Sequence, residues 1–293
     1  MSDTARTPGR TSMRVQPTGA ALGAEVHGVD PRALDGVAFD AIHRAWLDHQ
    51  VLLFRNLELT DEDLVALSRR FGDLDEAPVQ ETGRRFVEGH PEIYVISNVV
   101  QDGIAIGSLG SGEAVWHTDM SYLAHPPKAS ALYALEVPPQ GGDTSFCSMY
   151  AAWDELPGGL RDRLGGLRVK HDATYNSGGY VREGLTPSDD PPTSPGTFHS
   201  LVYVHPETGR RALYLGRRRN AYIEGLSLDD SNALLDEIWA ASTRESLTWR
   251  HQWRVGDLVI WDNRCTMHRR DAFDPAERRV MHRTQITSRQ DRG

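Results

Sequence analysis

The chain has 293 residues, of which 39% are hydrophobic and 25% charged, a composition typical of an ordinary globular protein with a sizeable core. Its 32 basic and 41 acidic side chains give a net charge of −9, which argues against a general nucleic-acid or anionic-membrane surface. The N-terminus lacks the apolar segment of a secretory signal, and no window approaches the roughly 18 apolar residues of a membrane span. A cytoplasmic protein is therefore expected.

Residues 1–13 are polar and are expected to form a disordered tail, followed by a single domain over 14–293, since no linker divides the chain. Cys147 and Cys265 form no CxxC pair, so both are predicted to be reduced and buried.

The first predicted helix follows Asp35, a candidate cap, and carries Phe39, Ile42, Trp46 and Leu47 on one face. The stretch "VLLFRN" then reads as a buried strand.

A capping-box pattern at Thr60 and Asp63 predicts a second helix that ends at Gly72, and "YVISNV" indicates another strand. Residues 103–112 contain four glycines and are expected to be flexible, as a mobile lid or an ordinary surface loop. Residues 183–198 hold four prolines and predict a long loop.

Later strands are indicated by alternating or continuous apolar segments, and further helices by Ser148 and Ser227 as caps. The predicted strands are "AVWHTD", "KASALYALEV", the hairpin "LVYVHPETGRRALYLG", "LTWRHQW", "GDLVIWDN" and "RVMHRTQIT". Many strands with peripheral helices favour a mainly β fold, a β-sandwich or jelly roll with helices packed outside.

His117 and Asp119 lie two residues apart in a predicted strand, so both side chains point to the same face. A histidine and a carboxylate in this arrangement can supply two ligands of a metal site, but the HxD pattern alone is a weak signal. The same spacing occurs at His90 and His205, each followed by Pro-Glu. Proline and turn-like surroundings make these two rivals less favourable.

The distal segment "WDNRCTMHRRDAFDPAERRVMHRT" adds His268, Arg279 and Arg283. Even spacing in an extended segment predicts that Arg279 and Arg283 share a face, where their planar guanidinium groups could bind anions. A surface strand rich in arginine is an equally open interpretation. The run Arg217, Arg218, Arg219 is expected to be a solvated loop, with steering of an anion as the alternative.

Taken together, "WHTD", "GGDT", "WDNRCTMH" and "RRVMHRT" resemble the Fe(II)/2-oxoglutarate-dependent dioxygenases of the taurine dioxygenase and 2,4-dichlorophenoxyacetate dioxygenase (TauD/TfdA) family. The resemblance runs from about residue 15 to 287 and includes "VLLFRN", "RRFGDL" and "HPETGR". It implies a double-stranded β-helix (jelly-roll) core with flanking helices, and Fe(II), 2-oxoglutarate and O2 as cofactor and co-substrates.

Carried over residue by residue, the resemblance implies that His117, Asp119 and His268 bind the iron. It also implies that Thr144 and Arg279 hold the distal carboxylate of 2-oxoglutarate.

For the primary substrate, the resemblance assigns Arg283 to a small anion, and Tyr122 is a further candidate pocket residue, whereas Arg278 is expected to face solvent. The chain reads Asp75, Glu76, Ala77 where the taurine enzyme has histidines, which puts taurine itself in doubt.

The expected reaction is hydroxylation, which can fragment the product, of an aryloxyalkanoate, sulfonate or related carboxylate. Two alternatives stay open at this point: a zinc-dependent hydrolase and a non-catalytic jelly roll that binds a small molecule. Whether the protein forms a homo-oligomer is also left open.

Overall fold

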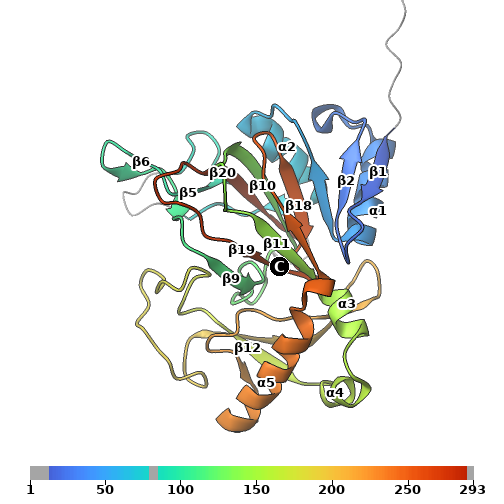
Figure 1. Ribbon diagram of the computed structural model, residues 1–293, viewed down its shortest axis with the longest axis vertical. Helices are drawn as coiled ribbons and strands as arrows, with labels where there is room; N and C mark the ends of the chain where they lie inside the picture. Colours follow the sequence, from blue (N-terminus) through green and yellow to red (C-terminus); the bar gives the residue numbers. More distant parts are fainter. Residues whose placement is uncertain (1–12, 79–84, 289–293) are drawn as a thin grey trace, which may run out of the picture.

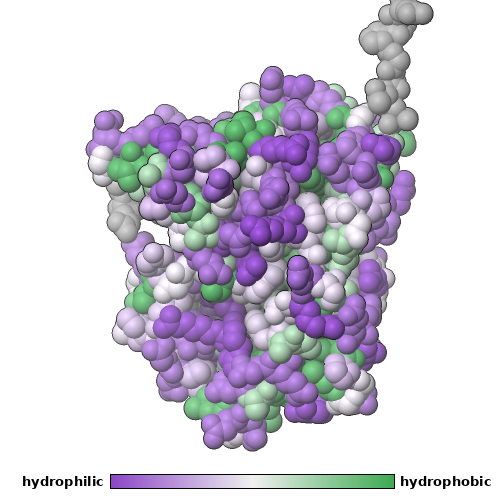
Figure 2. All heavy atoms as spheres, in the orientation of Figure 1, coloured by the Kyte–Doolittle hydropathy of each residue, from purple (hydrophilic) through white to green (hydrophobic). Residues whose placement is uncertain are grey.

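The computed structural model describes residues 13–78 and 85–288. The expected tail therefore lies outside the described residues except for Met13, which packs half-buried against a hydrophobic cluster. Within the described ranges, no helix is long and apolar enough to cross a membrane. Figure 2 shows a face covered mostly by hydrophilic residues, with apolar residues in separate small patches.

Strands dominate the molecule and form two larger sheets (Figure 1). The nine-stranded sheet has the order β1 (Arg14–Pro17), β2 (Ala24–His27), β3 (Val51–Phe54), β18 (Leu258–Asp262), β10 (Ala129–Glu136), β20 (Val280–Thr287), β5 (Tyr94–Ser97) and β8 (Ser108–Leu109), with β4 (Asp73–Leu74) paired to β20. The four-stranded sheet has the order β17 (Thr248–His251), β11 (Thr144–Ser148), β19 (Thr266–Arg270) and β9 (Ala114–His117).

The remaining elements lie around these sheets (Figure 1). They are β12 (Arg168–Asp172) between β13 (Gly196–Ser200) and β16 (Tyr222–Ile223), the pairs β14 (Val202–Val204) with β15 (Arg211–Leu213) and β6 (Val100–Gln101) with β7 (Ile104–Ala105), and the helices α1 (Gly36–His49), α2 (Asp61–Phe71), α3 (Met149–Asp154), α4 (Gly158–Arg163) and α5 (Leu228–Ser242), with short 3-10 turns at Pro31–Ala33 and Glu245–Leu247.

Both N-terminal helices begin at the residues that the sequence predicts. The Asp35 side chain accepts a hydrogen bond from the Ala38 amide at 2.8 Å, and Thr60 and Asp63 form a complete capping box. The apolar faces of both helices pack on one side of the large sheet. Loss of either N-cap side chain would cost about 1 kcal/mol.

Alternation along the central strands divides the core into two clusters on opposite faces of the large sheet. Residues such as Leu52 and Ile260 face α1 and α2, whereas their neighbours Leu53 and Trp261 face the four-stranded sheet. There Trp261 contacts Phe146 of β11, with ring centroids 5.5 Å apart. The fold is therefore mainly β with flanking helices, and its two sheets share a buried interface.

The glycine-rich segment 103–112 differs from the expected flexible loop because it contains β7 and β8. β8 pairs in parallel with β5, and a Cβ at Gly107 would lie 2.7 Å from the Val95 carbonyl oxygen. Glycine is required for this close approach of the two backbones. The proline-rich loop is as predicted up to Pro195, and β13 begins at Gly196.

Candidate active site

His117, Asp119 and His268 come together at the end of the four-stranded sheet. His117 is the last residue of β9 and pairs directly with His268 of the antiparallel strand β19, so their ring centroids are 4.2 Å apart. Asp119 Oδ1 lies 3.7 Å from His117 Nε2 and 3.9 Å from His268 Nε2. The three potential ligand atoms all lie within 4.8 Å of one another. One cation could contact all three.

Hydrogen bonds orient two of these side chains toward the shared point. His117 Nδ1 lies 2.7 Å from the Val115 carbonyl oxygen, which makes Nδ1 the protonated nitrogen and leaves the Nε2 lone pair facing Asp119. Asp119 Oδ2 accepts hydrogen bonds from Ser130 Oγ at 2.7 Å and Gln285 Nε2 at 3.3 Å. Oδ1 is thereby left toward the two imidazoles.

The protonation states also suit a metal. Burial, and then the neighbouring His117, lower the pKa of His268 to about 3, so this imidazole is neutral at physiological pH. Burial alone would raise the pKa of Asp119, but Arg283 and the two histidines hold it well below its usual range. The cluster therefore offers a neutral imidazole at His268, a second imidazole at His117 and a carboxylate, which are the donor types of a facial triad.

A cavity on the His268 side of the cluster is lined by Thr144, Arg270 and Arg279. Thr144 and Arg270 are directly paired across β11 and β19. Thr144 Oγ1 accepts a hydrogen bond from Trp253 Nε1 at 2.9 Å, so its own proton remains available to an acceptor in the cavity.

Both arginines of this cavity are buried, at 2% exposure for Arg279 and 8% for Arg270. Among residues 13–78 and 85–288, neither has an acidic side chain within ion-pair distance, and Arg279 Nε has no hydrogen-bond partner. Burial lowers the pKa of Arg270 to about 10, and burial with the nearby Arg270 lowers that of Arg279 to about 9. Buried guanidinium groups without an ion-pair partner favour an anionic ligand.

A second cavity adjoins the first and shares the lining residues His117 and Arg283 with it. Arg283 donates to Asp119 Oδ1 at 3.2 Å, and Tyr122 lines the same space. Arg279 and Arg283 thus face one region, as their spacing predicts. Arg278 instead pairs with Glu136 at the surface, which confirms the expectation that it faces solvent.

Sequence reasoning missed Arg182 and Arg270 of these cavities and favoured a solvated position for Arg217. Arg270 stands two residues after His268 on β19, and this spacing is the period-two signal that could have identified it. Arg217 is buried and lines the second cavity, so the prediction of a solvated loop is wrong for this residue, whereas Arg218 and Arg219 pair with surface aspartates.

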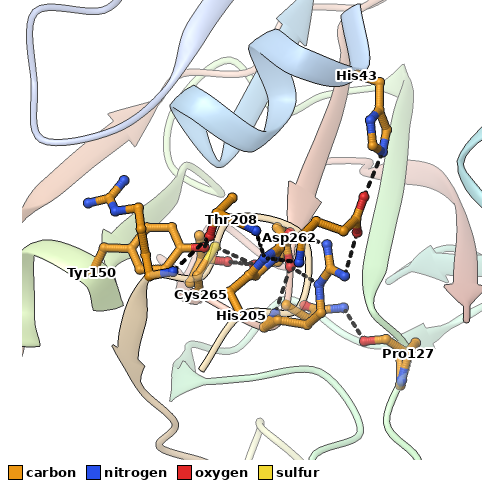
Figure 3. Close-up of polar contacts among 12 residues, drawn as sticks. His43, Pro127, Tyr150, His205, Thr208, Asp262 and Cys265 are labelled. Carbon is orange, nitrogen blue, oxygen red and sulfur yellow. Dashed lines mark hydrogen bonds and ion pairs between the residues drawn. The ribbon is translucent and has the colours of Figure 1, made fainter. Parts of the chain in front are cut away.

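A second buried cluster joins His205, Asp262 and Cys265 (Figure 3). His205 Nδ1 accepts from the backbone amides of Glu207 and Thr208, so Nε2 must carry the proton that it donates to Asp262 at 3.0 Å.

The side chains of Asp262 and Cys265 are also poorly suited to bind a metal ion. Both Asp262 oxygens also accept hydrogen bonds from Arg264, at 2.7 to 2.9 Å. Burial and Asp262 raise the pKa of the Cys265 thiol far above its usual range, and both cysteines are free and buried as predicted. The imidazole and the carboxylate already use their lone pairs in hydrogen bonds and the thiol stays protonated, which argues against a metal at the rival site of His205. His90 belongs to no such cluster among the described residues.

Comparison with known proteins matches residues 14–285 to the family model described as taurine catabolism dioxygenase TauD, TfdA family. The chain is 31% identical to an (S)-phenoxypropionate/alpha-ketoglutarate-dioxygenase from Delftia acidovorans, covering 96% of this chain and 97% of the relative. It is 36% identical to pentalenolactone F synthase from Streptomyces arenae, covering 92% and 93%.

A crystal structure of a taurine dioxygenase from Burkholderia xenovorans superimposes with a TM-score of 0.76 at 35% identity, covering 94% of this chain and 91% of that one. The family model and both relatives span nearly the whole length of the chain. The chain therefore belongs to the TauD/TfdA family of dioxygenases.

Proposed function

We propose that this protein is an Fe(II)- and 2-oxoglutarate-dependent dioxygenase that hydroxylates a small anionic substrate. The observation that carries the proposal is a cluster of two histidines and one aspartate bordered by two cavities that both contain arginine. The overall change converts 2-oxoglutarate, O2 and a substrate C–H bond into succinate, CO2 and a C–OH group.

Nε2 of His117, Nε2 of His268 and Oδ1 of Asp119 would hold the iron on one face and leave its other positions open. When bound, Fe(II) supplies the activation of O2 that is coupled to decarboxylation of 2-oxoglutarate. The protein contributes ligands, orientation and a buried environment. Retention of Asp119 as a carboxylate ligand favours hydroxylation as the outcome.

Arg279 and Thr144 would hold the distal carboxylate of 2-oxoglutarate, with Arg270 as a second cation in the same cavity. A guanidinium and a hydroxyl can donate several hydrogen bonds to one carboxylate, which offsets the cost of burying both charges.

The primary substrate would occupy the second cavity, with an anionic group at Arg283 and Tyr122 beside it. Asp75, Glu76 and Ala77 line this cavity, so the features that put taurine in doubt lie where the substrate would bind. The relatives are named for a phenoxypropionate and for pentalenolactone F, so likeness alone does not identify this substrate.

The two sheets that share one buried interface support a double-stranded β-helix (jelly-roll) core, and the presence of β1 and β20 in one sheet supports a single domain over 14–293. A cytoplasmic location remains a prediction from the sequence.

The two alternatives are less well supported. The family and its named relatives are dioxygenases, which favours oxygenase chemistry over a zinc hydrolase. The complete ligand set and the arginine-lined cavity beside it favour a catalyst over a non-catalytic binding protein.

A succinate assay tests the proposal. Protein reconstituted with Fe(II) is incubated with 2-oxoglutarate, O2 and a panel of phenoxyalkanoates, sulfonates, sulfate esters and carboxylates. We expect at least one compound to raise succinate above the His117→Ala control. No succinate above that control with any member of the panel would contradict the proposal.

A further inference from the structure

We propose that the primary substrate is a small dianion, with one anionic group at Arg283 and the second bound by Arg182 and Arg217 on another part of the same cavity. This inference rests on the proposed function and specifies the class of substrate that the site accepts.

Arg217 is held at the cavity by a close approach of the chain behind it. A Cβ at Gly216 would lie 2.5 Å from His171 Nδ1 and 3.0 Å from Ser121 Oγ, so only glycine allows the segment after β15 to pass there. Arg217 is 9% exposed, and its Nη2 donates to the Asp172 carbonyl oxygen at 2.8 Å. This hydrogen bond orients the guanidinium group without neutralising its charge.

Arg182 approaches the same space from the segment after β12. Its amide donates to the Thr174 carbonyl oxygen, and its guanidinium carbon lies 4.1 Å from the centre of the Tyr122 ring. Its Nε is buried and has no hydrogen-bond partner among the described residues. Arg182 also lies close enough to Arg217 to contribute, after burial, to lowering the pKa of Arg217 to about 10. Two cations are thus held near each other, an arrangement that a bound anion would stabilise.

The two glutamates that line this cavity pair with other arginines. Glu76 pairs with Arg85 at 2.6 Å and Glu92 with Arg69 at 2.5 Å, and neither arginine lines the cavity. Within residues 13–78 and 85–288, no carboxylate lies within ion-pair distance of Arg182 or Arg217.

Asp172 also supplies negative charge near this pair and acts on Arg217 through space. Its carboxylate accepts hydrogen bonds from Thr174 Oγ1 and the Tyr175 amide. One carboxylate offsets the charge of two guanidinium groups only in part.

The 2-oxoglutarate dianion does not supply the missing negative charge. Its distal carboxylate is proposed to lie at Arg279 and Arg270, which line the other cavity and not this one. Of the three arginines in the substrate cavity, only Arg283 has a carboxylate partner, Asp119, and that carboxylate is also the proposed iron ligand. Positive charge therefore remains both at Arg283 and at the pair of Arg182 and Arg217, which a substrate with two anionic groups would match better than a monoanion.

Binding measurements with matched probes test this inference. Protein loaded with Fe(II) and saturating 2-oxoglutarate without oxygen is titrated calorimetrically with 3- and 4-carboxyphenoxyacetate and with adipate to suberate. Each dianion is compared with its monoamide, which has nearly the same shape and one charge fewer. We expect the best dianion to bind roughly tenfold or more tightly than its amide. Arg217→Gln and Arg182→Gln should reduce this ratio to about twofold or less.

Arg218→Gln is the matched control, since Arg218 is the next residue along the chain but pairs with Asp236 at the surface and should leave the ratio unchanged. Arg217→Lys, which keeps the charge, should retain part of the preference and guards against misfolding of the glutamine variant. The inference is overturned if no dianion binds better than its amide, or if the preference survives in both glutamine variants. Failure of wild-type protein to bind 2-oxoglutarate at all would instead count against the proposed function.

Discussion

Two buried clusters of histidine and aspartate lie in this protein, and they differ in whether their lone pairs are already used. In the cluster of His205 and Asp262, the imidazole and carboxylate atoms are occupied by hydrogen bonds from backbone amides, from each other and from Arg264 (Figure 3). In the cluster of His117, Asp119 and His268, the Nε2 atoms and Oδ1 converge on one point instead. Residue types alone do not separate a metal site from a structural network, whereas the hydrogen bonds do.

The cluster of His205 and Asp262 (the structural cluster) helps to position the cluster of His117, Asp119 and His268 (the metal-ready cluster). Asp262 ends β18, and its backbone carbonyl accepts from Thr266 Oγ1 at 2.7 Å, which fixes the turn into β19. His268 follows two residues later on that strand. A fixed turn therefore positions the distal histidine opposite His117.

The largest effect is expected from a substitution that removes a histidine of the metal-ready cluster. Substitutions behind a metal ligand already cost about 10–100-fold in metal affinity or activity, so His268→Ala should lower succinate formation by more than about a hundredfold. The His205→Gln variant is the comparison, and it should retain iron binding once folded. Equal loss of iron from both variants, measured by metal content after desalting, would mean that the two clusters do not differ as described.

Asp262→Asn should instead break the structural cluster. Removing one partner of a buried ion pair costs about 3–5 kcal/mol, so we expect a loss of that size in the free energy of unfolding measured in urea. Asp236→Asn removes the exposed carboxylate that pairs with the half-buried Arg218 and should cost less than about 1 kcal/mol. Similar losses for the two variants would show that Asp262 does not stabilise the fold through its buried contacts.

Substitutions of Arg279 and Arg283 should affect the binding of 2-oxoglutarate and of the primary substrate differently. Arg279→Gln is expected to weaken the binding of 2-oxoglutarate by about 2–3 kcal/mol and the binding of the primary substrate much less. The reason is that Arg279 and Arg283 are proposed to donate charge-assisted hydrogen bonds to different anions. Arg283→Gln should do the reverse. Affinities from anaerobic titrations test this pattern, and equal effects of both substitutions on both ligands would refute the assignment.

The smallest effect is a pH dependence of the metal-free protein. The pKa of His268 falls to about 3 in the folded state, below its ordinary value of about 6.5, so the unfolded chain takes up a proton first as the pH falls. The contribution of His268 to the free energy of unfolding should therefore be fully present above about pH 6.5. It should fall by about 2 kcal/mol between that pH and pH 5. His268→Asn should remove this part of the slope in urea unfolding, and an unchanged slope would contradict it.

The sequence predicted the local features of the site better than its tertiary ones. His117 and Asp119 share a face because strand geometry has a period of two, and the caps at Asp35 and Thr60 are local hydrogen bonds. The pairing of β9 with β19 that brings His268 to His117 is not a local property, and only the family resemblance indicated it.

The errors have the same physical origin. Three consecutive arginines look alike in the sequence, but the contact of Gly216 with His171 buries Arg217 and leaves Arg219 exposed. Residues 103–112 are glycine-rich and look flexible, yet the parallel pairing of β8 with β5 orders part of them. Both outcomes depend on contacts between segments far apart in the chain.

Anomalous diffraction at the iron edge tests the central claim most directly, with crystals grown anaerobically in Fe(II). The account predicts one iron per chain bound to Nε2 of His117, Nε2 of His268 and Oδ1 of Asp119, at distances near the roughly 2.0–2.2 Å that the same donors adopt on zinc. Iron at the cluster of His205, Asp262 and Cys265, or His268 beyond coordination distance of the iron, would contradict it.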